Sequence, residues 1–142
     1  MYDKLKDRIK VHEGFRNYVY KDSLGKRTVG YGHLCLEDEN WQDNEEYDMK
    51  LLDDCFESDF SDALDGAEDL IGFMPLLPKA KEVIVEMVFQ LGKGGVSKFK
   101  KMWEALAKED YAEAANQMLD SRWHKQTKSR AESLATIMRS LA

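Results

Sequence analysis

Apolar residues recur at helical spacing through most of the chain and at alternating positions in one short part of it. The first residues place an apolar side chain every three or four positions, which predicts an amphipathic helix over residues 2–13. Residues 16–36 alternate instead around a turn at Gly25 and predict a small antiparallel sheet. Helical spacing then returns and predicts one long helix over residues 45–69, marked by Leu51, Leu52, Cys55, Phe56, Phe60, Ala63, Leu64 and Ala67.

The second half of the chain repeats the helical pattern and contains no alternating stretch. After a loop rich in Gly and Pro, its apolar positions predict a core helix that ends at Gly92, two short helices and a final helix. This order predicts an α+β fold that is mostly α, with strands only in an N-terminal lobe. We expect one domain in which lobe 1 covers about residues 14–56, the interlobe helix about 45–69, and an all-helical lobe 2 about 70–142 together with the N-terminal helix.

Length and composition restrict the class of protein. With 142 residues, of which 43% are hydrophobic, the chain has enough apolar material for the core of one domain. No stretch approaches the roughly 20 apolar residues that cross a bilayer, so membrane insertion is not expected. The charged residues 1–10 lack an apolar signal core, which predicts synthesis in the cytoplasm without a signal peptide. Neither a basic stripe interleaved with aromatic residues nor a metal-ligand spacing is present, so we expect no nucleic acid and no metal. We also expect a monomer and no cofactor.

Cys35 and Cys55 are the only cysteines of the chain. Two thiols do not form a disulfide framework, and both are expected to be small buried apolar side chains. A bridge between them is the alternative, because the end of the sheet could meet the long helix. Synthesis in a reducing cytoplasm disfavours that bridge.

The net charge of −6 is distributed unevenly. Residues 37–69 hold 15 acids and one base, a net charge of −14, while the rest of the chain carries +8. The acids recur mainly every three or four residues, which is typical of the solvated face of a helix and differs from the spacing of a calcium loop. The surface outside this segment is therefore predicted to be basic.

Two acids are placed to act on one bond. Glu13 ends the first predicted helix, just before Gly14, and the negative end of the helix dipole disfavours its ionised form. Asp22 lies in a Lys-Asp-Ser-Leu-Gly turn, where it should stay solvated and ionised, although Asp is also a common turn residue. A protonated and an ionised carboxyl group across a cleft are what glycosidic hydrolysis requires.

The segment from Glu13 to Leu34 resembles the catalytic segment of the T-even phage-type lysozymes, endolysins that cleave the glycan of bacterial peptidoglycan. The matching motifs, in the family's spacing, are Glu13-Gly14, Tyr20-Lys21-Asp22, Gly25 and Thr28-Val29-Gly30-Tyr31-Gly32-His33. Residues 87–92 and 121–130 are similar as well, so the resemblance covers most of the chain in order. Met102 and Gln117 depart from the family, where these sugar-contacting positions are usually small or amide residues.

The resemblance implies a role for each matching residue. Glu13 would be the proton donor, Asp22 the carboxylate that serves the attacking water, and Thr28 the hydroxyl that holds this water. Arg130 would pair with Glu13, and His33 would pair with Asp59 of the long helix. The saccharide cleft would be lined by Gly32, Leu34, Phe89, Gln90 and Arg122.

The function expected from this resemblance is hydrolysis of the β-1,4 bond between N-acetylmuramic acid and N-acetylglucosamine, as an endolysin in phage-induced host lysis. Such an enzyme would need a holin-type membrane-lesion protein to reach the wall from the cytoplasm. Two alternatives stay open: a lytic transglycosylase, and a non-catalytic peptidoglycan-binding module on the same fold. Retention of Asp22 and Thr28 beside Glu13 favours hydrolysis.

Overall fold

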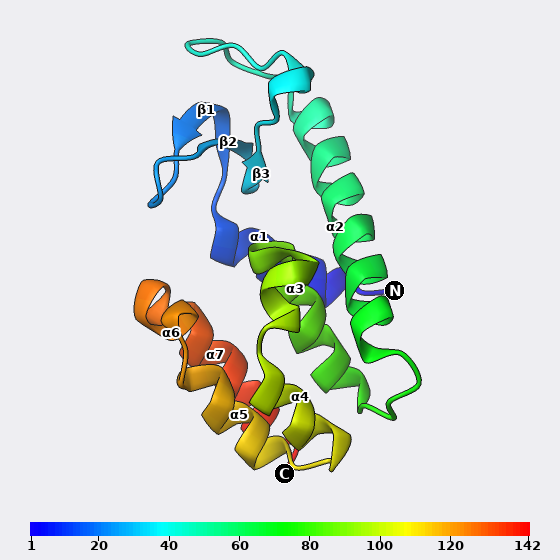
Figure 1. Ribbon diagram of the computed structural model, residues 1–142. Coiled ribbons are helices and arrows are strands. Elements are labelled where there is room, and N and C mark those ends of the chain that lie inside the picture. The colour runs from blue at the N-terminus through cyan, green and yellow to red at the C-terminus, as the bar shows by residue number, and fades with distance from the viewer. The chain divides into compact units, whose positions relative to one another are not determined.

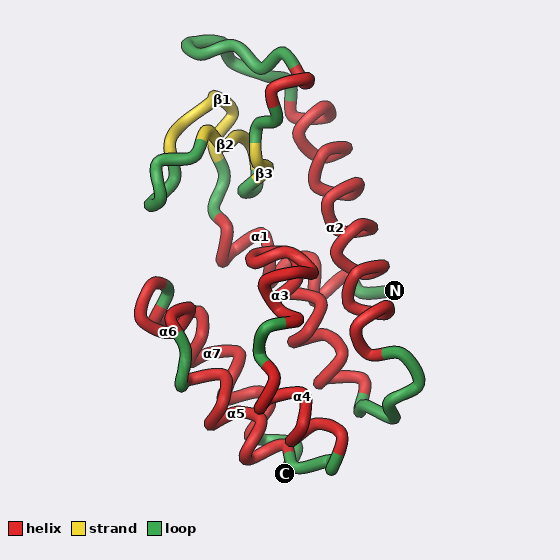
Figure 2. The backbone as a smooth tube through the Cα atoms, in the orientation of Figure 1, coloured by secondary structure: helices red, strands yellow, loops and turns green.

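The computed structural model describes all 142 residues, and the chain divides into two compact units, residues 1–62 and 63–142. The N-terminal unit holds helix α1 (Asp3–Glu13), strands β1 (Arg16–Lys21), β2 (Arg27–Gly30) and β3 (His33–Leu34), the 3₁₀ turn η1 (Glu37–Glu39) and most of helix α2 (Met49–Ile71). Strands, helices and loops are distinguished by colour in Figure 2. Helix α1 belongs to the same compact unit as the strands. Its assignment to the helical lobe, made from the sequence, remains a prediction.

The sheet is antiparallel in the order β1-β2-β3, as the alternating pattern predicts. Its hairpin is closed by a hydrogen bond from the Asp22 N–H to the Lys26 carbonyl and by Gly25 at φ 80°, a conformation that glycine adopts without strain. The β2–β3 sheet packs on the first part of α2, which lies beside the strands in Figure 1. Gly30 approaches Leu52 so closely that a Cβ on Gly30 would lie 3.3 Å from its side chain.

The long helix begins later than the sequence pattern predicts. Residues 45–48 are not helical, and α2 runs from Met49 to Ile71. The Tyr47 N–H donates to the Asn17 carbonyl at 2.7 Å, and the Tyr47 ring packs edge-on against Trp41 at 4.7 Å. These contacts hold the segment as a loop against the sheet, which overrides its local helical tendency.

The C-terminal unit is entirely helical. It contains α3 (Pro78–Ser97), α4 (Lys100–Ala107), α5 (Tyr111–Leu119), α6 (Arg122–Gln126) and α7 (Lys128–Arg139), together with the end of α2. Helices α4 and α7 pack on α5, and α7 also contacts α3 and α6. Gly92 has φ 79° and ψ 160°, so the helical path of α3 is broken where the sequence predicts its end. The short helix α6 was not predicted as a separate element.

Each unit has its own apolar core. In the N-terminal unit the buried side chains come from the apolar stripes of α1 and α2 and from β2, and in the C-terminal unit from all helices: the largest are Leu5, Ile9, Leu52 and Phe56, then Ile84, Met87, Met102, Leu106, Met118, Leu134 and Met138. The predicted α+β class, predominantly helical with one small antiparallel sheet, is confirmed. Cys35 and Cys55 are free and half-buried, and burial raises the pKa of both thiols.

Candidate functional site

Glu13 is the last residue of α1, and its carboxyl group lies against the backbone of the β2–β3 turn. A Cβ on Gly32 would be 2.4 Å from Glu13 Oε1, so only glycine leaves room for the carboxyl group at this place. Gly32 also has φ 74°, which disfavours any other residue. Gly14 follows the helix with φ 74° and caps it by donating to the Lys10 carbonyl. The sequence around Glu13 therefore fixes both the end of the helix and the surroundings of its carboxyl group.

Asp22 is held by the hairpin turn that it helps to form. Its Oδ1 accepts hydrogen bonds from the backbone N–H groups of Leu24 and Lys26, both at 2.9 Å. Its Oδ2 accepts none, and the side chain is half-buried. The carboxylate thus combines a turn-forming oxygen with a second oxygen that is available to a ligand or a water molecule.

Thr28 occupies the start of β2, directly opposite Tyr20 of β1. It is 4% exposed, and its hydroxyl donates to the Lys26 carbonyl at 3.0 Å. This bond uses the only proton of the hydroxyl, so the remaining lone pairs can accept a hydrogen bond from a water molecule. Directly opposed residues of an antiparallel pair lie on the same face of the sheet, and Asp22, two residues after Tyr20, continues that face.

Tyr20 is a residue that the sequence analysis did not assign to the site. Burial raises the pKa of its phenol, and the carboxylate of Glu13 raises it further; Arg16 opposes them and Asp22 adds a smaller increase. The Arg16 guanidinium lies over the Tyr20 ring, 5.1 Å from its centre. One phenol is thus within electrostatic reach of both candidate carboxylates, which belong to the same compact unit. Its place two residues before Asp22 on a strand was the signal that could have identified it.

His33 of β3 joins the sheet to α2 through two carboxylates. Its Nδ1 is 2.7 Å from Asp59 Oδ2, the partner that the resemblance implies, and its Nε2 is 3.0 Å from Glu39 Oε1. The hydrogen bond to Asp59 raises the pKa of His33 to about 9, against the opposing effect of burial and with a further contribution from Glu39. Glu39 was not predicted, and it also accepts hydrogen bonds from the Leu36 N–H and the Trp41 indole.

The pKa of Glu39 is shifted in the opposite direction from that of His33. Burial alone would raise the pKa of its carboxyl group, but the hydrogen bonds from Leu36 and His33 outweigh burial and lower the pKa below its ordinary 4.5. The resulting cluster is a positive imidazole between two carboxylates. No group of three or more His, Cys, Asp or Glu side chains is arranged to hold a metal ion. The hydrogen bonds of His33 to Asp59 and Glu39, and of the Leu36 N–H to Glu39, tie the loop before α2 to β3 and α2, and we refer to this cluster as the clamp.

Arg130 of α7, the residue that the resemblance pairs with Glu13, makes an ion pair within its own unit. Its Nε donates to Glu86 Oε2 of α3 at 2.9 Å, and Arg130 is 9% exposed while Glu86 is fully buried. Glu86 was not predicted as a site residue. The available signal was its position as the only charged residue in the apolar run from Val83 to Phe89.

The predicted saccharide-lining residues are divided between the units. Leu34 of β3 is 45% exposed, and Gly32 lies just before this strand. Gln90 of α3 is tied down inside the C-terminal unit: its Oε1 accepts from the Trp123 indole at 2.9 Å, and its amide donates to Thr127 at 3.3 Å. Gln90 therefore fixes α6 against α3, and its contact with a saccharide remains a prediction, as does that of half-buried Phe89.

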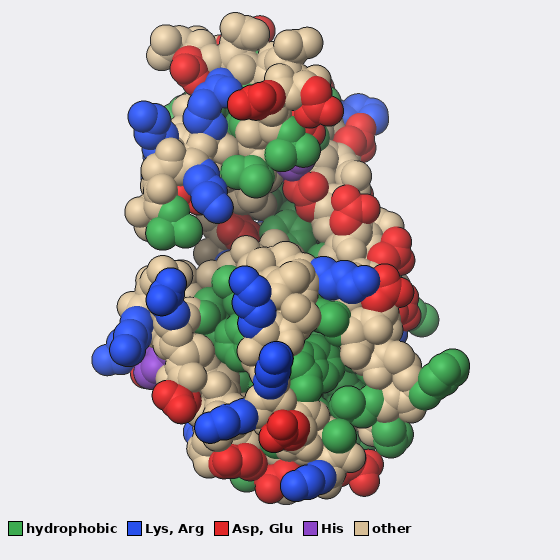
Figure 3. All heavy atoms as spheres, in the orientation of Figure 1, with side chains coloured by type: hydrophobic (Ala, Val, Ile, Leu, Met, Phe, Trp, Pro, Cys, Tyr) green, Lys and Arg blue, Asp and Glu red, His purple; other side chains and the backbone are tan.

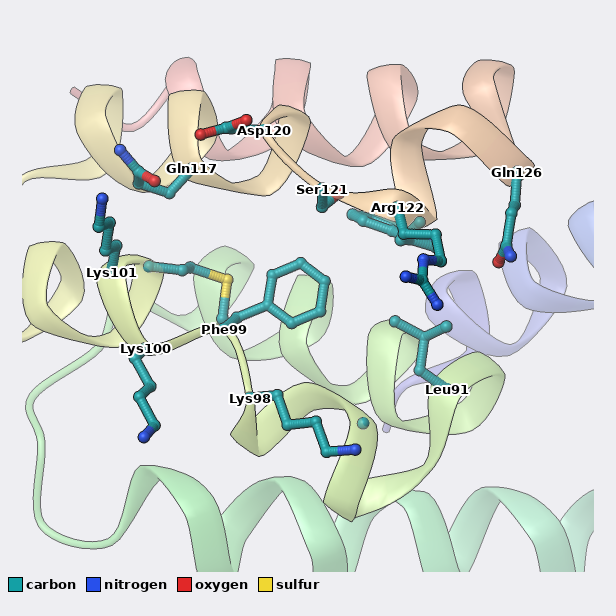
Figure 4. Close-up of a pocket in the computed structure, with 13 residues that line it drawn as sticks. Leu91, Lys98, Phe99, Lys100, Lys101, Gln117, Asp120, Ser121, Arg122 and Gln126 are labelled. Atoms are coloured by element: carbon teal, nitrogen blue, oxygen red, sulfur yellow. The ribbon is translucent and has the colours of Figure 1, made fainter.

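A pocket of about 650 Å³ is cut into the C-terminal unit between the α3–α4 segment and the α5–α6 segment. Figure 4 shows Phe99 near its centre, with the guanidinium of Arg122 directed toward Leu91. Four cations line it, namely Lys98, Lys100, Lys101 and Arg122, against a single carboxylate, Asp120. None of the four cations forms an ion pair, so they are available to an acidic ligand. Of the predicted residues, the pocket contains Arg122.

The acidic segment is separate from this pocket in the sequence. Figure 3 shows Asp and Glu side chains gathered along α2, while Lys and Arg side chains are spread over the helical unit. The apolar side of α2 is buried through Leu52, Phe56 and Phe60, and most of its acids are exposed, as expected for a solvated helix face.

Comparison with known proteins agrees with these motifs. The family model described as phage lysozyme matches residues 10–140. "Probable T4-type lysozyme 2" of Dictyostelium discoideum is 30% identical, with 96% of this chain and 94% of the relative covered, and "Probable T4-type lysozyme 1" of the same organism is 27% identical at 97% and 95% coverage. The pre-baseplate central spike protein Gp5 of Enterobacteria phage T4 is 28% identical over 94% of this chain, which corresponds to 27% of the spike protein.

The matched segment contains all the candidate residues described above, from Glu13 to Arg130. None of the helices is both long and apolar enough to cross a membrane. The family implies peptidoglycan as the substrate and the cell wall as the place of action. The chain belongs to the phage lysozyme family and is a lysozyme-type glycoside hydrolase.

Proposed function

We propose that this protein hydrolyses the β-1,4 glycosidic bond between N-acetylmuramic acid and N-acetylglucosamine, with Glu13 as proton donor, Asp22 as base and Thr28 as the residue that orients water. The observation that carries this proposal is that one compact unit holds two carboxyl groups in different surroundings. Glu13 lies against the backbone at Gly32, and Asp22 is fixed by two backbone N–H groups with one oxygen left available. Most glycosidases use a pair of carboxyl groups whose surroundings differ.

In the reaction, Glu13 gives its proton to the glycosidic oxygen as the bond from this oxygen to the anomeric carbon breaks. Positive charge develops on the sugar, and the carboxylate of Asp22 stabilises it. A water molecule that donates one hydrogen bond to Asp22 and one to Thr28 presents its lone pair to the anomeric carbon. Asp22 takes the water proton as the new bond forms. This single displacement inverts the anomeric carbon and requires carboxyl groups roughly 6.5–9.5 Å apart.

Binding of the glycan is the second part of the proposal. Gly32 and Leu34 in the N-terminal unit, and Phe89, Gln90 and Arg122 in the C-terminal unit, would each contact the saccharide. The four unpaired cations of the pocket support a role in attracting an acidic wall polymer. The chain as a whole has a net charge of −6, but this pocket is net positive. The positive charge around the pocket would attract an acidic ligand.

A lytic transglycosylase is the competing assignment, because it uses a single acid and an intramolecular displacement. An available Asp22 oxygen beside a Thr28 hydroxyl favours hydrolysis, since a transglycosylase needs neither. Mass spectrometry of digested peptidoglycan separates the two reactions: we expect reducing ends, whereas anhydro-sugars would indicate transglycosylation and undigested wall a binding module.

Glu13→Gln tests the role of the proton donor. The amide keeps the shape and loses the proton, so turnover should fall by at least about a thousandfold while the fold is retained. Glu104→Gln, an exposed acid-to-amide change on α4, is the matched control and should be as active as the wild type. Undiminished turnover by Glu13→Gln would refute the proposed chemistry.

We further propose that the activity serves phage-induced lysis of a bacterial host. The family supports this role, while the relatives include both free-standing lysozymes and part of a phage spike protein. Expression inside bacteria with and without a holin-type protein tests it, since lysis should depend on the membrane lesion. Lysis that is independent of the holin would refute this route.

A further inference from the structure

Arg16 of β1 is an exposed cation that no carboxylate neutralises. Its guanidinium carbon lies 5.1 Å from the centre of the Tyr20 ring and 5.9 Å from the centre of the Tyr18 ring. Its Nη1 also donates to the Tyr18 hydroxyl at 3.1 Å. The side-chain partners of Arg16 are therefore two tyrosines, although the chain contains 27 acids.

The contacts of Arg16 lie within a single strand and join no two elements of the fold, unlike the clamp, which ties a loop to β3 and α2. Arg16 is exposed and Tyr18 is 40% exposed, while the intervening Asn17 and Val19 are half-buried, as expected for the two faces of a strand. Folding alone therefore explains this cluster poorly. What the cluster presents to solvent is an aromatic ring beside a positive charge.

The guanidinium is held in place before any ligand arrives. Its hydrogen bond to Tyr18 and its contact with the Tyr20 ring order a long side chain in advance, which lowers the entropic cost of binding. One N–H group is used by Tyr18, and the others remain for a planar anion such as a carboxylate, which arginine binds through parallel hydrogen bonds. The exposed ring of Tyr18 offers an apolar surface with a polar edge, which suits the apolar face of a sugar ring.

The cluster lies close to Asp22 within the same compact unit. Strand β1 leads from it directly into the hairpin that carries Asp22 (Figure 1). Tyr18 and Asp22 are four residues apart, a span of at most about 13 Å along an extended strand. Arg16 and Asp22 also act on the same phenol, that of Tyr20, whose pKa is lowered by the arginine and raised by the carboxylate. A glycan strand bound at Asp22 can therefore extend along β1 to Tyr18.

We propose that Arg16 and Tyr18 form a further saccharide subsite of the N-terminal unit, in which the Tyr18 ring packs on a sugar ring and the Arg16 guanidinium binds a carboxylate carried by N-acetylmuramic acid. This inference rests on the proposed function, because it takes the peptidoglycan glycan as the ligand and adds a preference for its acidic sugar. The carboxylate belongs either to the free lactyl group or to the peptide attached to it, and its hydrogen bonding to arginine is the same in both cases. N-acetylglucosamine has no such group, so the subsite distinguishes the two sugars of the strand.

Arg16→Gln tests the charge, and binding is measured by calorimetry in the Glu13→Gln background, which prevents turnover. The ligands are glycan strands without peptides, whose lactyl carboxylates are free, strands that keep their peptides, and neutral N-acetylglucosamine oligomers of the same length. We expect Arg16→Gln to weaken the binding of acidic strands about fivefold, the size of effect of an exposed ion pair, and to leave the neutral oligomers unchanged. Lys4→Gln is the matched control and should change neither, because Lys4 is an exposed cation without an ion pair on α1 of the same unit.

The two acidic ligands identify the source of the carboxylate. A loss of affinity for strands without peptides assigns the carboxylate to the lactyl group, and a loss only for strands that keep their peptides assigns it to the peptide. Tyr18→Ala removes the ring and should weaken acidic and neutral ligands alike by several-fold, whereas Tyr18→Phe keeps the ring and should bind the neutral oligomers as the parent does. Phe73→Ala, which removes a fully exposed ring from the C-terminal unit, is the control for the ring and should have no effect.

The inference is overturned if Arg16→Gln weakens neither acidic ligand, or if it weakens acidic and neutral ligands equally. If Arg16→Gln does not fold, an NMR titration of Glu13→Gln with Arg16 intact decides instead: the Arg16 Nε–H signal should shift with an acidic strand and stay in place with the neutral oligomers, and an unmoved signal overturns the inference. Any of these failures leaves the proposed function intact as long as Glu13→Gln is inactive. An active Glu13→Gln would remove the proposed function and the inference with it, so the two failures are distinguishable.

Discussion

The candidate carboxylates of the N-terminal unit and the buried carboxylate of the C-terminal unit are held in opposite ways. In the N-terminal unit, Asp22, Glu39 and Asp59 are partly exposed and are held by backbone N–H groups or by His33. In the C-terminal unit, Glu86 is completely buried and is matched by Arg130. A partly exposed carboxylate can reach water and substrate and can titrate, whereas a buried ion pair responds to neither. The N-terminal unit is thus suited to the proton transfers and the C-terminal unit to a fixed electrostatic setting.

The largest effect should come from breaking the buried pair. Arg130→Met leaves the Glu86 carboxylate buried without its arginine and should lower the free energy of unfolding by about 3–5 kcal/mol. The double variant Glu86→Leu/Arg130→Met should recover most of this loss, because no charge then remains buried. Urea denaturation at constant pH measures both.

The control for the buried pair is Lys93→Met, which breaks the exposed pair of Lys93 with Asp69 at 3.1 Å. Exposed pairs contribute little, so its cost should stay below about 1 kcal/mol. Equal costs for Arg130→Met and Lys93→Met would contradict the contrast between the buried and the exposed carboxylates.

A second test concerns the space that glycine leaves for Glu13. Gly32→Ala would place a Cβ 2.4 Å from Glu13 Oε1 and must displace the carboxyl group. We expect a loss of activity of about a hundredfold, typical of a misplaced catalytic group. Gly72→Ala is the control, since Gly72 also has positive φ, at 57°, but has nothing within 4 Å.

Both glycine variants should lose about 1 kcal/mol of stability from the strained backbone, and only Gly32→Ala should lose activity. Wall-clearing assays and thermal melts of the two proteins separate the contributions. Full activity in Gly32→Ala would show that the position of Glu13 tolerates displacement.

The stabilisation by the clamp around His33 should depend on pH. Its folded pKa of about 9 lies above the ordinary 6.5, so its stabilisation is fully present below pH 6.5 and is lost as the pH rises through 9. The lowered pKa of Glu39 acts from the other side: its stabilisation is present above its ordinary 4.5 and is lost as the pH falls. The contribution of the clamp is therefore greatest between these two ordinary values.

Denaturation of His33→Asn should show a deficit of about 2 kcal/mol near pH 5.5, after allowance for solvent screening, and a much smaller deficit at pH 10. Glu39→Gln should show a smaller deficit that also declines toward pH 10. A deficit that is independent of pH would mean that His33 stabilises the loop by packing alone.

The smallest effect should come from the cations of the pocket. Lys98→Ser/Lys101→Ser should slow wall clearing by a few-fold at low salt, because two cations that attract an acidic polymer are lost. The difference from the wild type should shrink as salt screens the attraction, over a Debye length of about 10 Å at 0.1 M. Lys79→Ser, an exposed lysine outside the pocket, should have no effect. A salt-independent defect in the double variant would indicate damage to the pocket and not lost attraction.

The elements themselves were predictable because their causes are local. Each of these patterns is visible within a window of about ten to twenty residues. This holds for the apolar spacing of α1, α2 and α3 and for the alternation around Gly25, and each of these elements is present. Glu13 at a helix end and Asp22 in a turn were likewise visible, since both depend on neighbouring glycines and backbone groups. The start of α2 was predicted too early, because Tyr47 is bonded to Asn17 and packed on Trp41, contacts that no local pattern encodes.

Tertiary structure alone decided which distant side chains meet. The pairing of Glu86 with Arg130 spans 44 residues, and four cations from α3–α4 and α6 share one pocket only because the helices pack as they do. Glu39 reaches the His33 cluster through the fold of its loop, and no sequence motif marks it. Tyr20 belongs to a motif, but its electrostatic contact with Glu13 depends on how the strand packs beside the end of α1. The sequence by itself determined the helices, the hairpin and the two candidate carboxyl groups through local periodicity and turn chemistry. Their electrostatic surroundings follow from packing between segments, which a pattern of neighbours along the chain does not contain.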